Sequence, residues 1–272
     1  MDRLAYLRDL EEQRGIGAFD PLFDAFLSCL SASEACGFLD LEFDQDFCVR
    51  QKIVTRIRDD MRADFGDCHK ELLATLAALL PVLTRKKATP CAFCLEQLFE
   101  GCDLEMREMI VQLLMNSRYK DMRNRAYRIL REHWDNRWEP QVETAWAAFR
   151  EPSCAVLAVE RMPTWFLGDN FDELFAALPS FWPFGKLFGR LAEVKPEHWN
   201  RLRQKDGVTY AYVHAKMGLR IEAAEAIRLY EENKGHESVG LLVWSIGKMR
   251  LWEALVHIEA DTSRNLRVLE RA

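Results

Sequence analysis

Residues 103–130 read DLEMREMIVQLLMNSRYKDMRNRAYRIL, and this stretch decides the fold class. In its first half, apolar side chains recur every three or four residues, while charged and amide side chains occupy the positions between them. This is the spacing of one face of an α-helix. The second half repeats the pattern, with Met122, Ala126 and Leu130 on the apolar face. Two amphipathic helices joined by a short connection are therefore predicted here.

The same periodicity continues through nearly the whole chain. Prolines stand at positions expected to begin helices, where their missing N–H group costs nothing: Pro21, Pro90, Pro140, Pro152 and Pro196. Residues 39–44 alternate apolar and acidic side chains, which predicts either a short strand or an extended linker. We expect an all-α protein of about fourteen to sixteen helices, with sequential neighbours packed as antiparallel pairs.

A motif within residues 103–130 resembles a known repeat. Met106 and Arg107 are followed by Ile110 and Leu114, four and eight positions after the methionine. Met122 and Arg123 are followed by Ala126 and Leu130 at the same spacing. With an aspartate shortly before each methionine, this order resembles the second helix of HEAT and armadillo repeats. A second segment, residues 218–230, resembles the turn and second helix of a tetratricopeptide unit. The resemblance implies an irregular α-solenoid of the HEAT-like class.

Length and composition agree with a folded helical protein. The chain has 272 residues, of which 49% are hydrophobic and 29% charged, which excludes collagen-like, low-complexity and wholly disordered chains. We expect one continuous domain with four sections: an acidic N-terminal helical section, a HEAT-like array, an aromatic-rich joint and C-terminal helical repeats, at residues 1–46, 47–160, 161–200 and 201–272. The joint holds nine aromatic residues between positions 165 and 199, either as core or as a partner-binding groove.

Charge is distributed unevenly along the chain. The formal net charge is −6, but residues 1–46 alone hold eleven acidic residues against three arginines, a net −8. Such an acidic protein is a poor general binder of nucleic acid. Within the first section Asp40, Glu42 and Asp44 form a candidate acidic edge, which lacks the glycine and final glutamate of a calcium loop. The edge is either a solvated surface or a site for a basic protein.

Residues 117–137 have the opposite charge, with seven basic residues against three acidic ones. Arginines in this segment are candidates to hold a phosphate backbone while nearby tryptophans stack on bases. Some HEAT-like proteins are DNA glycosylases with tryptophans and an acid on a basic surface, a composition that Trp134, Asp135 and Trp138 share. The alternative is a solvated face, or one that docks on the chain's own acids. The candidate basic face consists of Arg118, Arg123, Arg125, Arg128, Trp134 and Trp138.

Cysteines provide the one candidate metal site. Cys91, Cys94 and Cys102, with the pair Cys68 and His69 nearby in sequence, supply thiolate and imidazole ligands of the kind zinc prefers. The alternative is that these cysteines are small buried hydrophobic residues, because no second CxxC or HxxxH motif accompanies them. Cys68 and His69 diverge by about 100° on one helix, so they are not expected to form a nucleophile and base pair. No cofactor is expected.

The remaining signals concern compartment and activity. The N-terminus has no uninterrupted apolar region of a secretory signal, and the eight cysteines are too sparse for a disulfide scaffold, so a cytoplasmic protein with reduced thiols is expected. No segment reaches the roughly 20 apolar residues that span a bilayer, so no membrane association is expected.

The chain contains none of the short catalytic motifs GxSxG, P-loop and HExxH, which favours a protein without enzymatic activity. The sequence predicts a protein–protein interaction module, with an acidic inhibitor or immunity-type binder as one form. The alternative is a nucleic-acid-binding or DNA-repair protein that uses the basic face at 117–137.

Overall fold

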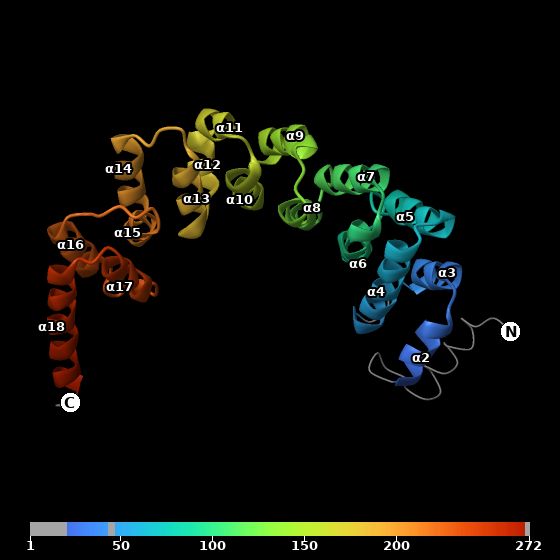
Figure 1. Ribbon diagram of the computed structural model, residues 1–272, viewed down its shortest axis with the longest axis horizontal. Coiled ribbons are helices and arrows are strands. Elements are labelled where there is room, and N and C mark those ends of the chain that lie inside the picture. Colours follow the sequence, from blue (N-terminus) through green and yellow to red (C-terminus); the bar gives the residue numbers. More distant parts are fainter. Residues whose placement is uncertain (1–20, 43–46, 270–272) are drawn as a thin grey trace. The chain divides into compact units, whose positions relative to one another are not determined.

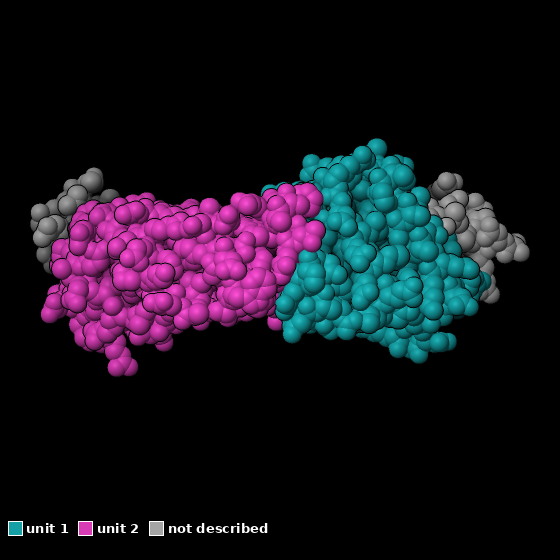
Figure 2. Space-filling model, turned by 90° about the horizontal axis from the view of Figure 1, so that it is seen from above, with its two compact units in different colours: residues 1–141 teal, residues 142–272 magenta. Residues whose placement is uncertain are grey.

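The computed structural model describes residues 21–42 and 47–269, and every regular element in those residues is a helix (Figure 1). The described part contains 17 α-helices, α2 to α18, and two short 3-10 helices. The chain divides into two compact units, residues 1–141 and residues 142–272 (Figure 2). No helix in the described residues is long and apolar enough to cross a membrane. The all-α prediction is confirmed.

The first unit stacks its helices in two rows. α3 packs against α5 and α5 against α7, while α4 packs against α6 and α6 against α8 (Figure 1). Contacts between α3 and α4, α5 and α6, and α7 and α8 join the rows, so each helix buries its apolar face between neighbours. The helices are α2 (Pro21–Cys29), α3 (Ala32–Glu42), α4 (Phe47–Ala63), α5 (Asp67–Leu79), α6 (Arg85–Leu98), η1 (Phe99–Gly101), α7 (Leu104–Met115), α8 (Lys120–Glu132) and η2 (Asn136–Trp138).

The division between the units falls near the start of α9 (Glu139–Phe149). In the second unit α13 packs against α10 and α15, α15 against α17, and α16 against α18. A continuous apolar core, which includes Val208, Leu229 and Ile246, joins α15 to α18. The helices are α10 (Pro152–Arg161), α11 (Thr164–Asp169), α12 (Phe171–Ala177), α13 (Trp182–Arg190), α14 (Pro196–Lys205), α15 (Gly207–Lys216), α16 (Ala223–Asn233), α17 (Val239–Lys248) and α18 (Trp252–Leu269).

The stretch that decided the fold class folds as predicted. Residues 103–130 form α7 and α8, and the apolar positions Ile110, Leu114, Met122 and Leu130 are completely buried. Asp103 caps α7, because its carboxylate accepts a hydrogen bond from the backbone N–H of Met106 at 3.0 Å. Periodicity and capping together account for this helix pair.

Two helix boundaries differ from the predictions. Pro90 lies inside α6, which begins five residues earlier at Arg85, whereas Pro21, Pro152 and Pro196 each begin a helix. Residues 39–42 belong to α3 rather than to a strand or linker, because Leu39 is needed in the helical core, where it is fully buried. Residues 43–44 of that run lie outside the described residues.

The aromatic-rich joint is more regular than expected. Three helices, α11 to α13, fall within residues 161–200, and α14 begins there. The described chain has 17 α-helices, one above the expected range. Five of the nine aromatic residues are buried core: Phe166, Phe171, Phe175, Phe184 and Phe188. Trp165 and Trp182 remain 56% and 39% exposed. The section boundaries predicted after residues 46, 160 and 200 stay predictions.

Candidate functional site

Two members of the predicted basic face are buried. Arg123 is 8% exposed, and its Nη1 donates a hydrogen bond to the carbonyl oxygen of Ser117 at 2.6 Å. The tight connection from α7 to α8 leaves this carbonyl without a helical donor, and the guanidinium satisfies it. Trp138 is 2% exposed, so its ring fills the core and cannot stack on a base. Neither residue belongs to an exposed binding face.

Two further arginines of the basic face share one carboxylate. Arg125 and Arg128 of α8 both pair with Glu96 of α6, the second at 2.6 Å from Arg128 Nε to Glu96 Oε1. The Glu96 side chain is 10% exposed and that of Arg125 is 17% exposed, so this pair is largely screened from solvent. The acid that neutralises the face therefore comes from the helix packed against it.

The last two members of the basic face differ in exposure. Arg118 is exposed, lies 4.8 Å from the ring centroid of Tyr119, and donates to the carbonyl oxygen of Leu83 at 3.4 Å. Trp134 is half-buried, and its indole N–H donates to Asn136 at 3.2 Å. The structure thus leaves a smaller and more neutral surface at residues 117–137 than the sequence predicted.

The acidic edge lies at the border of the described residues. Asp40 and Glu42 belong to the last turn of α3, but their side chains are not described. Asp44 lies outside the described residues. The edge stays a prediction from the sequence.

The three zinc candidates are core residues. Cys91, Cys94 and Cys102 are buried, and burial raises the pKa of each thiol to about 12. The Cys91 thiol donates to the carbonyl oxygen of Leu76, and the Cys102 thiol donates to that of Leu98, both at 3.3 Å. These cysteines are protonated side chains of the packed interior, as the alternative interpretation held. In the described residues Cys91, Cys94 and Cys102 do not form a close group of three metal ligands, so the metal hypothesis gains no support for this set.

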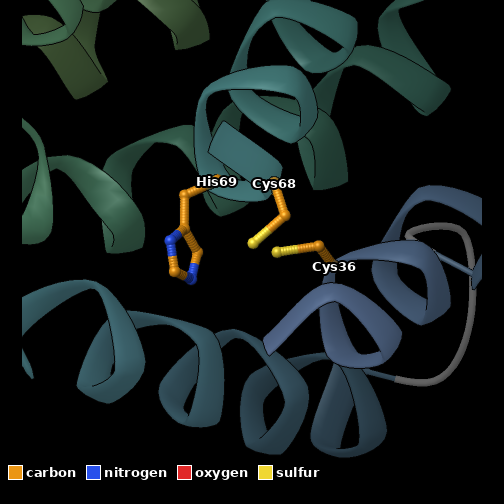
Figure 3. Close-up of side chains that lie close together, drawn as sticks. All are labelled: Cys36, Cys68 and His69. Atoms are coloured by element: carbon orange, nitrogen blue, oxygen red, sulfur yellow. The ribbon is translucent and has the colours of Figure 1, made fainter. Parts of the chain in front are cut away.

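A different thiol cluster forms between α3 and α5. Its members are Cys36, Cys68 and His69, and their sulfur and ring nitrogen atoms lie within 4.8 Å of one another (Figure 3). It is the one group of three metal-ligand side chains in the described part of the chain. Cys36 is 5% and His69 is 2% exposed, whereas Cys68 is partly exposed. The sequence indicates Cys68 and His69 as candidate ligands but not Cys36, because nothing in it shows that α3 packs on α5.

The two ring nitrogens of His69 differ. Nδ1 accepts a hydrogen bond from the backbone N–H of Gly66 at 3.1 Å, whereas Nε2 is buried without a hydrogen-bond partner. Burial lowers the pKa of His69, against the raising effect of Asp64, so the imidazole is neutral near pH 7. Because Nδ1 is an acceptor, the proton of the neutral ring is on Nε2. Burial, and to a lesser degree the adjacent Cys68, raises the pKa of Cys36 to about 12.

An exposed group on the second unit is not evident from the sequence. Trp244 of α17 is 43% exposed, and its ring lies 6.0 Å from that of Tyr212 on α15, between ring centroids. Lys216, one turn after Tyr212, places its ammonium 5.6 Å and 5.3 Å from the centroids of these two rings. The ring of Phe181, before α13, lies 6.2 Å from that of Tyr212. We call these four residues the aromatic surface.

The backbone at the edge of the aromatic surface is strained. Phe181 has φ 74° and ψ −121°, a conformation that side chains with a Cβ atom rarely adopt. Its N–H donates to Oγ1 of the buried Thr209 at 3.1 Å, and that hydroxyl donates to Asp206 at 2.6 Å. Asp206 also caps α15 through the N–H groups of Val208 and Thr209. This network holds the strained residue in place, a feature typical of functional segments.

Comparison with known proteins adds no relative from which a role could be transferred, because no family model, no curated protein and no solved structure matches the chain.

Proposed function

We propose that this protein is a cytoplasmic, non-enzymatic protein-binding module, built on an irregular helical-repeat scaffold of the HEAT-like class. The aromatic surface, Phe181, Tyr212, Lys216 and Trp244, is the proposed contact for the partner. The single observation that carries the proposal is the half-exposed Trp244, flanked by Tyr212 and a lysine on neighbouring helices.

The packing of the first unit supports the scaffold. Alternate helices contact one another in two rows, α3–α5–α7 and α4–α6–α8, as expected where successive helix pairs stack on one another. Arg107 and Arg123, which hold equivalent positions in the repeated motif, also act alike. Each guanidinium donates to backbone carbonyls just before its own helix, Arg107 to those of Phe99 and Glu100 and Arg123 to that of Ser117.

The chemistry of the aromatic surface favours a protein partner. Tryptophan and tyrosine dominate the binding energy of protein interfaces, because they bury a large area with few rotatable bonds. Lys216 adds a positive charge over both rings, and the exposed Lys248 lies one turn beyond Trp244 on the same helix. The surface therefore suits an apolar anchor flanked by acidic side chains.

The nucleic-acid alternative has weaker support. Phosphate binding needs cations that face solvent, but Arg123 is buried and Arg125 and Arg128 already share Glu96. Arg137 pairs with Asp135, with Nε at 3.1 Å from Oδ1. The acidic-inhibitor form rests on the charge of residues 1–46 alone and would use a surface separate from the aromatic one.

Affinity capture from the native cells tests the proposal. The wild-type protein, Trp244→Ala and Trp165→Ala are used as baits at equal amounts. Trp165 is the matched control, because it is 56% exposed on α11, which carries no residue of the aromatic surface. We expect a partner that the wild-type protein and Trp165→Ala enrich equally. This partner should bind Trp244→Ala at least about 30-fold more weakly, because an interface hot spot contributes about 2 kcal/mol to binding.

Two results would contradict the proposal. One is a partner set that Trp244→Ala retains in full. The other is tight, salt-sensitive binding of a labelled oligonucleotide that Arg118→Glu and Arg128→Glu abolish, which would favour the nucleic-acid alternative.

A further inference from the structure

We propose that Cys36 and Cys68 are a peroxide-sensitive thiol pair that forms an intramolecular disulfide between α3 and α5, with His69 as a positioning residue that stabilises the attacking thiolate. The site is distinct from the aromatic surface and does not depend on the proposed partner.

Geometry brings the two sulfur atoms together. They belong to helices that pack directly on each other, they lie within 4.8 Å of each other, and their side chains point toward one another beside the imidazole (Figure 3). The two cysteines also differ in access, because Cys36 is buried while Cys68 is partly exposed. Cys68 is therefore the sulfur that a small oxidant reaches first, and Cys36 is in position to resolve it.

Cys68 lies at the start of a helix and beside His69. Cys68 is the second residue of the 13-residue helix α5, where the free N–H groups and the helix dipole favour anions. The buried Nε2 of His69 has no hydrogen-bond partner, and the Cys68 sulfur, which lies within 4.8 Å of a ring nitrogen of His69, is the acceptor that we assign to its N–H. The neutral state of His69 makes this N–H a fixed donor rather than a base.

The same hydrogen bonds disfavour a metal at this site. A metal ion needs a lone pair on a ring nitrogen of His69, but the lone pair of Nδ1 accepts the N–H of Gly66 and Nε2 carries the proton. Moving the proton to Nδ1 would place its N–H against the N–H of Gly66 and break the hydrogen bond between Gly66 and His69 at the start of α5. The cluster also offers only three ligands, against the four of a structural zinc site.

The chemistry balances with hydrogen peroxide as the oxidant. Cys68 gives up its thiol proton and the resulting thiolate attacks one peroxide oxygen. The O–O bond breaks, the sulfur is oxidised by two electrons to a sulfenic acid, and the leaving hydroxide takes up that proton as water. The Cys36 sulfur then attacks the Cys68 sulfur, the S–O bond breaks, and the leaving hydroxide takes the Cys36 proton as a second water. Two thiols become one disulfide and one peroxide becomes two waters.

The experiment uses the full-length protein and mapping of oxidised peptides by mass spectrometry. Reduced wild type is treated with hydrogen peroxide, free thiols are blocked, and linked peptides are identified. Cys29→Ser is the matched control, because Cys29 is the exposed cysteine of α2 outside the cluster. We expect a Cys36–Cys68 link in wild type and Cys29→Ser, and a dimedone-reactive sulfenic acid on Cys68 in Cys36→Ser.

A fourth variant tests the positioning role. His69→Phe keeps the ring that stacks on Phe65 at 6.0 Å between centroids but removes the Nε2–H donor together with the Nδ1 acceptor of the Gly66 N–H. We expect the peroxide rate constant of Cys68 to fall about tenfold, with its pH–rate profile shifted to higher pH and an unchanged circular dichroism spectrum. Oxidation of Cys29 without a Cys36–Cys68 link, or stoichiometric zinc binding that Cys36→Ser abolishes, would overturn the assignment.

Discussion

Replacing Phe181 with glycine and with alanine tests the strain at the aromatic surface. Both variants remove the same half-buried ring, which costs about 1 kcal/mol of burial in either case. They differ only in the backbone, because glycine adopts φ 74° and ψ −121° freely while alanine keeps the Cβ atom that disfavours this conformation. The comparison therefore isolates the backbone strain.

The sign of the difference is unusual. At an ordinary loop position glycine is less stable than alanine by about 0.5–1 kcal/mol, because it loses more entropy on folding. A strained residue of this kind stores about 1–3 kcal/mol, which glycine releases. The balance predicts that Phe181→Gly is more stable than Phe181→Ala by about 1 kcal/mol, although both are less stable than wild type.

Urea unfolding followed by circular dichroism measures these free energies. The same pair of substitutions at Glu193, an exposed residue between α13 and α14 with negative φ, is the control and should show glycine as the less stable variant. A glycine variant at Phe181 that is also less stable than its alanine partner would refute the strain argument. Both Phe181 variants should bind the partner more weakly, since both lack the ring.

Three further changes have defined outcomes. Glu96→Gln leaves the poorly exposed Arg125 without its carboxylate partner and should lower the free energy of unfolding, measured in urea, by about 2–3 kcal/mol. An unfolding free energy equal to that of wild type within error would contradict the pairing. Gly101→Ala places a Cβ atom 2.7 Å from Met61 Cβ and should cost about 1–3 kcal/mol in the same assay, whereas an unchanged midpoint would contradict that close contact. Burial acts to raise the pKa of Asp206, but hydrogen bonds to the carboxylate outweigh burial and lower this pKa below 3.8. The Asp206 carboxylate therefore stabilises the fold fully at neutral pH, and this stabilisation is lost as the pH falls through the lowered pKa. The stability gap between wild type and Asp206→Asn should therefore be constant from pH 6 to 8 and narrow toward pH 3, and a gap that widens in acid would contradict this sign.

Periodicity predicted the helices well because each helix buries one face against neighbours. Met122 and Leu130 are buried where the pattern placed them, and the capping role of Asp103 follows from its place before an apolar run. Pro90 shows the limit of local signals. The favourable packing of α6 over its whole length outweighs the backbone hydrogen bond that an internal proline removes.

The candidate sites were harder to predict, because they depend on contacts between helices distant in sequence. A charged window looks like a binding face until Glu96, 29 residues before Arg125, is found beside it. Cys36 approaches Cys68 only because α3 packs on α5, and no spacing in the sequence encodes that contact. Trp244 and Tyr212 form one surface for the same reason.

Site-specific photo-crosslinking in the native cells tests the protein-binding role most directly. A photoreactive amino acid replaces Lys248, one turn beyond Trp244, or Lys186, an exposed residue of α13, as the comparison position. The account predicts one protein crosslinked from position 248 that is absent from position 186 and lost when Trp244 is also changed to alanine. No crosslink at 248, or an adduct that persists without the indole ring, would contradict it.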